Sequence, residues 1–431
     1  MVSVVRASKF RHVFGEEIQE KFQDIRPNHL SSESTLIKSN GTNVALAWES
    51  GNAGVLAVLN MSEIGRIPTE HPFIKGHTGP ITDFDFNPFN DQQLISCSDD
   101  STLKLWDIPQ GGLTEDLNTP RVTLQGHSKK IMLVEFHPCA AYICASAGTD
   151  KTIKVWNIEN AVPSCDFKAV PDGIFTLKWS NLGKALGFTC RDKKARVVDI
   201  RNNQVSYEVA VHEGGKPSKL TWIDETRFVT CGFSRMSDRQ VALWDLRNNE
   251  TPVKLTNIDQ GSGVIYPFYD SDTNMLFLAG KGDGNIRYYE QLEDELHYVE
   301  SFKSTTPCKG VTFIPKRKVD ADSCEIMRAL KLTSGTIDQI SFKVPRRTEA
   351  FQDDIFPPVV SGEPSLSAEE WLRGEDREPV RRDWKNLSSV EAKAPALEVK
   401  TIDDYKRELE EKDDIIKKLQ ERVKELEDKL N

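Results

Sequence analysis

The chain has 431 residues, of which 38% are hydrophobic and 28% are charged, and its formal net charge is −10. A chain of this length exceeds the usual single domain unless internal repeats extend it. The negative total disfavours a nucleic-acid binder steered by its overall field.

The start of the chain lacks a continuous apolar segment of signal-peptide length, and no run of eighteen apolar residues follows it. Eight cysteines occur without any C-x-x-C pair, which favours reduced thiols over a disulfide framework. We therefore expect a cytoplasmic protein without membrane insertion.

Two segments show internal repetition: residues 75–108 read KGHTGPITDFDFNPFNDQQLISCSDDSTLKLWDI, and residues 125–158 read QGHSKKIMLVEFHPCAAYICASAGTDKTIKVWNI. Both run from Gly-His to Trp over the same distance, and runs such as Ile81–Phe86 and Thr102–Trp106 alternate apolar with polar residues. This pattern is typical of a WD-repeat blade.

Weaker copies occupy residues 167–200, 210–246 and 261–290, and degenerate ones lie around 43–67 and 301–344. The sequence therefore predicts an all-β fold, a seven-bladed WD-repeat β-propeller over residues 1–345. A closed ring needs its last blade to be completed by the first part of the chain. We expect Val2–Val5 or Phe10–Phe14 to supply that strand.

Residues 346–373 contain prolines and widely spaced apolar anchors (Phe351, Ile355, Phe356 and Trp371), and we expect them to form an extension packed on the propeller. Residues 374–400 are rich in charge and contain two prolines, so they are predicted to be a linker with little structure of its own.

Residues 401–431 carry apolar side chains on alternating three- and four-residue steps, with one defect at Lys412. These are the a and d positions of a coiled coil, which is too short to be stable without partners. We assign oligomerisation to eight positions of this segment: Leu409, Ile416, Leu419, Arg422, Val423, Leu426, Glu427 and Leu430.

Each clear repeat contains a His, a Ser, an Asp and a Trp at fixed spacing, a composition that invites comparison with a hydrolase triad. A catalytic set occurs once, whereas this one recurs with the blade, so we interpret it as a structural hydrogen-bond chain whose loss, for example at Asp100, destabilises the protein. The two sets are His77, Ser96, Asp100, Trp106 and His127, Ser146, Asp150, Trp156. A less regular third set is His212, Ser234, Asp238 and Trp244.

Two other motifs resemble a phosphate loop and a zinc site but lack residues that such sites need. Gly280-Lys281-Gly282 lacks the spacing and the Ser or Thr of a phosphate loop and is predicted to be a turn. His137 and Cys139 have no partner pair at zinc-type spacing. We expect no metal, no cofactor and no catalytic activity.

Several segments are more specific than generic repeats: VVRASKFRHVFG (4–15), FQDIR (22–26), CRDKKARVVDIR (190–201), CGFSRMSDRQVALWD (231–245), YPFYDSDTNMLFLAGKGDGNIRYYE (266–290), PKR (315–317), CEIMR (324–328) and VPRRTEAFQDDIFP, which ends at residue 357. Through them the chain resembles a short coronin along nearly its whole length.

The resemblance implies a cytoskeletal protein of the actin-rich cortex that binds actin filaments, regulates their turnover and engages the branch-nucleating actin-related-protein complex. It implies filament binding by Arg26, the basic residue after the aromatic-x-Asp-Ile stretch. An exposed guanidinium suits the acidic actin surface. The alternative is an Arg at a strand end without such a role. Three further basic residues near the start, Arg6, Lys9 and Arg11, are also candidates for actin binding.

The resemblance also extends to the predicted coiled coil, because residues 422–427 match the family's trimerising motif at every position. Arg422 falls at g and Glu427 at e, beside an apolar seam of Val423 and Leu426. A parallel homotrimer is the specific expectation, and a dimer is the alternative. The linker is shorter and less basic than in many family members, so a second filament or microtubule contact from it is not expected.

Two other classes of function are the alternatives. A general WD-repeat scaffold for trafficking or signalling partners would share the same frame but ignore actin. An enzyme would need a unique constellation of reactive groups in a cleft, and the sequence offers none.

Overall fold

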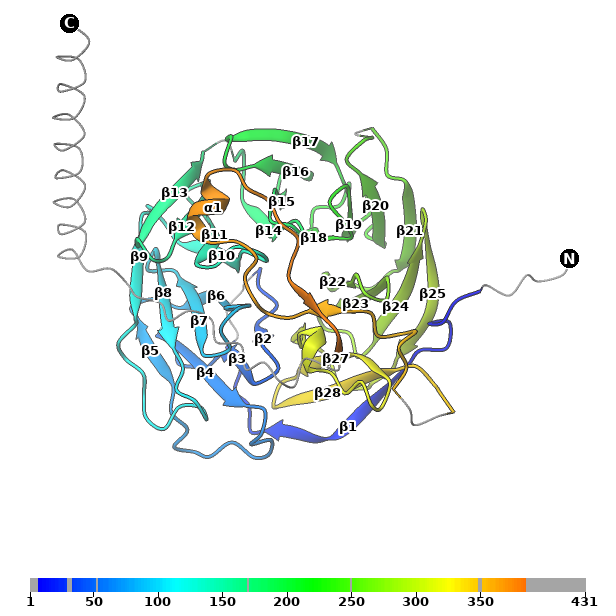
Figure 1. Cartoon of the computed structure of the whole chain (residues 1–431), viewed down its shortest axis with the longest axis horizontal. Helices are drawn as coiled ribbons and strands as arrows, with labels where there is room; N and C mark the ends of the chain where they lie inside the picture. The colour runs from blue at the N-terminus through cyan, green and yellow to red at the C-terminus, as the bar shows by residue number, and fades with distance from the viewer. Residues whose placement is uncertain are drawn as a thin grey trace, which may run out of the picture.

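The computed structural model describes residues 7–28, 33–51, 53–168, 170–248, 250–347 and 351–384. In this part of the chain seven four-stranded antiparallel sheets are arranged as blades around a central axis (Figure 1). The predicted seven-bladed propeller is confirmed.

Six blades take four consecutive strands each. Their strands are β2 (Ile37–Ser39), β3 (Asn43–Ala47), β4 (Gly54–Asn60), β5 (Ile74–His77); β6 (Ile81–Phe86), β7 (Gln93–Ser98), β8 (Thr102–Asp107), β9 (Val122–Gln125); β10 (Ile131–Phe136), β11 (Ile143–Gly148), β12 (Ile153–Asn157), β13 (Val162–Phe167); β14 (Ile174–Trp179), β15 (Leu186–Cys190), β16 (Lys194–Asp199), β17 (Gln204–Ala210); β18 (Lys219–Trp222), β19 (Arg227–Phe233), β20 (Arg239–Asp245), β21 (Lys254–Asp259); and β22 (Ile265–Asp270), β23 (Met275–Gly280), β24 (Ile286–Leu292), β25 (Glu295–Phe302).

The seventh blade closes the ring with strands from both ends of the propeller. β26 (Gly310–Phe313), β27 (Glu325–Leu332) and β28 (Thr336–Lys343) are completed by β1 (Phe14–Gln23), and a short 3-10 helix, η1 (Lys316–Lys318), lies between β26 and β27. Phe14 pairs with Lys343 and Gln23 with Thr336.

The closing strand does not lie where the sequence predicted it. Phe10–Phe14 is wrong, since Val13 donates its N–H to the Phe10 carbonyl in a turn and β1 begins at Phe14. Val2–Val5 lies outside the described residues. The strand was missed because it is an outer edge strand, mostly exposed and polar, with little apolar alternation to reveal it.

The hydrophobic core is divided among the contacts between neighbouring blades. One buried cluster joins Leu133 and Ile153 of one blade to Leu177 and Phe188 of the next. The short alternating strands produce this arrangement, because each sheet has two faces and both are covered by a neighbour.

The ring has two faces, which we call upper and lower. The upper face carries the turns between the second and third strands of each blade and the connections from one blade to the next. The lower face carries the other turns. Antiparallel order fixes this division, because every strand reverses the direction of the one before it.

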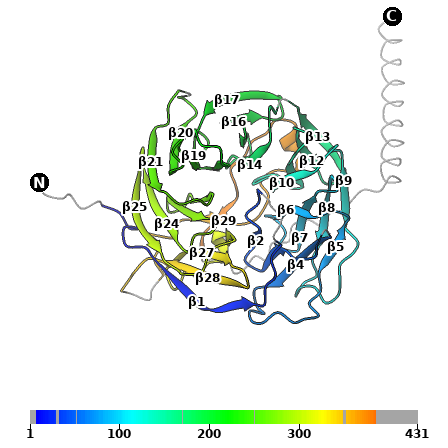
Figure 2. The ribbon, with the colours of Figure 1, turned by 180° about the vertical axis from the view of Figure 1, so that it is seen from behind.

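Residues 351–384 form a strap across the lower face. The strap contains β29 (Val359–Val360), α1 (Ala368–Leu372) and β30 (Arg381–Arg382), and β29 pairs with β30. Figure 1 shows it in orange in front of the ring, and Figure 2 shows it behind.

The strap is anchored by buried aromatic and aliphatic side chains. Trp371 is fully buried, lies 5.6 Å from Trp179 between ring centroids, and donates its indole N–H to the Gly183 carbonyl. Ser367 and Glu370 form a capping box that begins α1 in front of this tryptophan. The other predicted anchors lie near the seventh blade, where Ile355 and Phe356 are buried and Phe351 stacks on Phe356.

The strap extends past the boundary at residue 373 expected from the sequence. Residues 374–384, assigned to the linker, include β30 and Trp384, whose indole N–H donates to the Pro357 carbonyl. The pairing of β29 with β30 brings the chain back across the lower face. The predicted coiled coil, residues 401–431, lies outside the described residues.

Candidate functional site

Arg26 lies on the upper face, at the outer end of a segment that runs from the end of β1 toward the centre of the ring. Its backbone carbonyl accepts the Glu49 N–H at 2.9 Å, and the preceding Ile25 donates its N–H to the Gly335 carbonyl at 3.0 Å. The side chain is exposed, and it forms no ion pair with any residue that the structure describes. A rigid backbone therefore presents an unpaired guanidinium to solvent.

The inner end of this segment is fixed at the mouth of the central channel. The buried Lys219 ammonium donates to both the backbone carbonyl and the carboxylate of Glu33, each at 2.8 Å. Burial lowers the pKa of Lys219, and the neighbouring Glu33 carboxylate opposes that shift. Ser34 donates to Asp83 at 2.6 Å, and its carbonyl accepts the Tyr266 hydroxyl. These contacts could not be predicted from local sequence patterns, because the residues that form them are far apart in the chain.

The structure separates the basic residues that the sequence grouped near the N-terminus. Lys9 and Arg11 precede Phe14, the end of β1 that pairs with Lys343 at the lower face, whereas Arg26 follows its upper end. Ten extended residues span roughly 33 Å. The structure therefore does not bring Lys9 or Arg11 onto one face with Arg26, and their assignment to filament binding stays a prediction. Arg6 lies outside the described residues.

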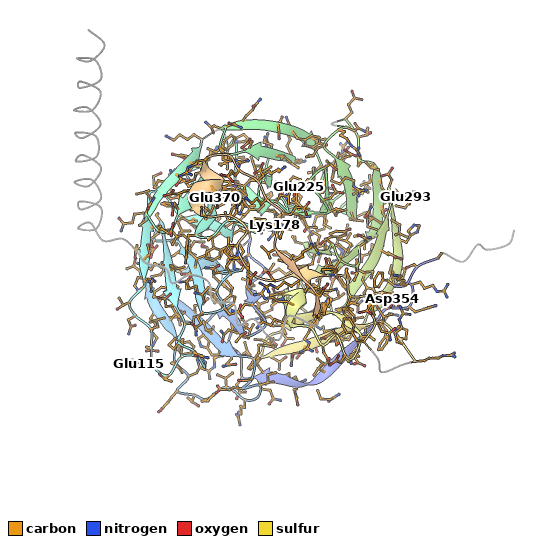
Figure 3. The ribbon with its side chains drawn as sticks, in the orientation of Figure 1. Glu115, Lys178, Glu225, Glu293, Asp354 and Glu370 are labelled. Carbon is orange, nitrogen blue, oxygen red and sulfur yellow. The ribbon has the colours of Figure 1, made fainter. Side chains whose placement is uncertain are left out.

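Lys9 also has an internal partner. Its ammonium donates to the Asp354 carbonyl of the strap at 2.8 Å, close to the position that Figure 3 labels. The neighbouring Ser8 is half-buried and donates its hydroxyl to Glu290. Arg11 is exposed.

The central channel contains a cavity of about 630 Å³. Two ion pairs line it: Lys38 lies 3.1 Å from Asp85, and Lys178, labelled near the centre of Figure 3, lies 2.6 Å from Glu135. Glu135 also accepts the Trp179 N–H from the next blade. These carboxylates bond to side chains and backbone of the adjacent blade. They therefore stabilise the closed ring.

The repeated His, Ser, Asp and Trp residues form one hydrogen-bond chain in each of two blades. In the first, His77 Nδ1 lies 2.8 Å from Asp100 and His77 Nε2 lies 2.8 Å from Ser96, whose oxygen accepts the Trp106 N–H at 2.8 Å. Burial raises the pKa of Asp100, but the hydrogen bond and charge of His77 together with the hydrogen bonds from Thr102 outweigh that effect and hold the pKa well below its ordinary value.

The second blade repeats this geometry with the same atoms. His127 lies 2.9 Å from Asp150 and 2.8 Å from Ser146, which accepts the Trp156 N–H at 2.8 Å. Burial lowers the pKa of His127, against the effect of Asp150. Ser96 and Ser146 are completely buried, so neither hydroxyl can reach a substrate.

The third set differs from the sequence prediction. Thr230, and not Ser234, accepts the Trp244 N–H at 2.8 Å and lies 3.0 Å from His212 Nε2. Ser234 and Asp238 bond to each other in the turn between β19 and β20. The prediction failed because this turn is longer than in the other two blades, so counting ten residues back from the tryptophan reaches the turn and misses the strand. Pairing strands from their register would have found Thr230.

The two remaining motifs from the sequence, the Gly-Lys-Gly segment and the His-Cys pair, have structural roles. Gly280-Lys281-Gly282 forms the turn between β23 and β24, as predicted, and Asp283 beside it binds the buried Arg239 at 2.8 Å. Both nitrogens of His137 are used, one by the Cys139 N–H and one near the Gly183 carbonyl. Across the described ranges there is no cluster of three His, Cys, Asp or Glu side chains that could hold a metal ion. Within the same ranges no helix is long and apolar enough to span a membrane.

Comparisons with known proteins agree with this architecture. Models described as "WD domain, G-beta repeat" match residues 69–107 and 118–157, and a "Type of WD40 repeat" matches 337–379. A "Domain of unknown function (DUF1899)" matches residues 3–66, which include β1 and Arg26.

Coronin-A of Dictyostelium discoideum is 42% identical over 439 residues, covering all of this chain and 97% of the relative. The coronin-like protein crn1 of Schizosaccharomyces pombe is 42% identical over 392 residues, covering 89% of this chain; the match spans 65% of that longer relative, just under two thirds. The crystal structure of the WD40 domain from Toxoplasma gondii coronin superposes with a TM-score of 0.83 at 36% identity, over 86% of this chain and 97% of that one. The chain therefore belongs to the coronin family.

Proposed function

We propose that this protein binds actin filaments, and that Arg26 on the upper face is a principal contact. The observation that carries the proposal is the exposed Arg26 side chain, which has no ion-pair partner among the described residues although its backbone is fixed on both sides. An unpaired guanidinium on a rigid support loses little conformational entropy when it binds a carboxylate on an acidic filament.

The protein acts by binding and not by catalysis. Each repeated His-Ser-Asp set is closed by a tryptophan that donates to the serine oxygen, which is buried in both regular blades. The charged side chains in the central channel that we described are engaged in ion pairs between blades. Neither arrangement offers a free nucleophile, acid or base to a substrate.

Three copies act together in this proposal. The coiled coil predicted at residues 401–431 would join them through Val423 and Leu426, with Arg422 and Glu427 pairing between helices. The described chain ends at Trp384 on the lower face, packed 5.1 Å from Phe356 between ring centroids. Joining three weak sites in this way would give avidity on a repeating filament.

The cellular role follows from the same proposal. The protein would organise the actin cytoskeleton at the cell cortex, regulate filament turnover and engage the branch-nucleating actin-related-protein complex. Co-precipitation with that purified complex tests the last part independently of filament binding.

The test of filament binding is co-sedimentation with actin filaments of the full chain, a chain ending at residue 400, and Arg26→Asp. Loss of a central interface arginine weakens binding about tenfold or more, and removal of the coil weakens it by loss of avidity. Arg347→Asp is the matched control, because that side chain is exposed at the lower face and forms no ion pair with a described residue. If the full chain does not pellet, the protein is a general WD-repeat scaffold and the proposal fails.

A further inference from the structure

A second group of basic side chains lies on the upper face, away from Arg26, over two adjacent blades. All of them are exposed and occur in the connections β9–β10 and β13–β14 and in the turns β11–β12 and β15–β16. We call this group the basic arc; it consists of Lys129, Lys151, Lys168, Arg191 and Lys193.

Hydrogen bonds show that these turns form one continuous surface. They are Thr149 N–H to the Lys130 carbonyl at 2.8 Å, Lys151 Nζ to the Pro171 carbonyl at 2.9 Å, Arg191 N–H to the Gly173 carbonyl at 2.8 Å, and Lys193 Nζ to the Glu213 carbonyl at 2.6 Å. Each turn therefore contacts the next one around the rim. The lysine bonds reach carbonyl groups, so they fix the ammonium groups without neutralising them.

Little negative charge opposes the basic arc. In the described residues, Lys129 and Arg191 form no ion pair, and Lys168 lies 3.5 Å from Asp166 while its side chain stays 76% exposed. Among the nearby acidic residues, Asp150 binds His127, Asp192 pairs with Arg196, and Asp99 of the neighbouring β7–β8 turn lies 3.8 Å from Lys130. Asp172 accepts the Gly173 N–H, which does not neutralise its charge. Glu213 is the exposed acid at one end. A positive surface thus stands out on a chain whose formal charge is −10.

We propose that the basic arc is a second docking surface for the acidic filament that Arg26 contacts, so that the upper face as a whole is the filament-binding face. This inference rests on the proposed function. Both sites lie on one face, whereas the lower face is covered by the strap of residues 351–384. Charges spread over two blades match an extended acidic protein surface and exceed the size of a small anion.

The composition of the surface favours a protein over a lipid membrane. Interfacial membrane binding uses apolar side chains that insert beside basic ones. Among the described residues, the large hydrophobic side chains with high exposure are Phe14, Val162, Val205, Met236, Leu255 and Tyr298. Met236 is the one that lies in an upper-face turn, and it belongs to a different blade from the basic arc.

The test uses the full chain and reverses three charges that have no role in the core: Lys129→Glu, Lys168→Glu and Arg191→Glu together. The control reverses three charges at the lower face, Arg247→Glu, Lys254→Glu and Arg347→Glu, with the same change in net charge; both arginines are exposed and Lys254 is half-buried. Co-sedimentation with actin filaments is measured at low and at high salt for both variants, the parent chain and Arg26→Asp. Thermal unfolding of each variant checks its folding.

We expect the basic-arc variant to bind about tenfold more weakly than the control at low salt, with a smaller difference at high salt, because exposed charges act mainly through screened attraction. Equal binding of the two triple variants, while the parent pellets, overturns the basic arc but leaves the proposed function standing. If the parent itself does not pellet, the proposed function fails first. Loss of flotation with phosphatidylserine vesicles, at unchanged filament binding, would assign the surface to membranes and overturn the inference.

Discussion

Replacing Thr230 with valine tests the hydrogen-bond chain that the sequence did not locate. Thr230 is completely buried, and its oxygen accepts the Trp244 N–H at 2.8 Å and lies 3.0 Å from His212 Nε2. Valine keeps the shape and removes the oxygen, so two buried polar groups lose their partner. At about 1–3 kcal/mol for each unsatisfied group, the free energy of unfolding should fall by about 2–6 kcal/mol.

The matched control is Ser234→Ala, at the position that the repeat spacing assigned to this role. Ser234 is half-buried in a turn and bonds only locally, to Asp238 and to the Met236 N–H, so its loss should cost about 1 kcal/mol or less. Urea unfolding of the full chain at fixed pH, followed by tryptophan fluorescence, measures both. A larger loss for Ser234→Ala than for Thr230→Val would refute the reasoning.

Three further predictions concern the stability of the protein in acid, the anchoring of the strap and the oligomeric state of the coiled coil. Burial lowers the pKa of His137 to about 3 and of His212 to about 4, below the unfolded value near 6.5. The stability that these neutral imidazoles contribute to the folded state is complete above pH 6.5 and is lost as the pH falls toward 4. The free energy of unfolding should therefore be about 2 kcal/mol lower for each imidazole at pH 5 than at pH 7. Identical urea midpoints at these two pH values would contradict this. Trp371→Ala should weaken the strap by about 3–5 kcal/mol and speed tryptic cleavage at Arg373, while an unchanged cleavage rate would show that other contacts hold it. Residues 400–431 alone should sediment at equilibrium as three chains, and a two-chain mass would exclude the trimer.

The repeat architecture could be read from the sequence because its signals are local. A blade is about forty residues long, and its Gly-His, Asp and Trp residues recur at spacings set within that blade. The two regular hydrogen-bond sets therefore follow from residues 75–108 and 125–158 by themselves. The third set did not follow, because a longer turn between β19 and β20 changed the spacing while the strand register kept Phe228 opposite Trp244.

Local pattern was least informative where the chain crosses from one blade to another. β1 is polar and mostly exposed, so its pairing with β28 depends on the closure of the ring and not on its own periodicity. Lys219 and Glu33 are 186 positions apart, and the strap joins residue 371 to residue 183. The sequence by itself determined the blades, the family and the heptad pattern, since each of these depends on residues that lie close together in the chain. Which charges share a face was decided only by the closed ring, which separates Arg26 from Lys9 along one extended strand and brings Lys129, Arg191 and their neighbours together across two blades.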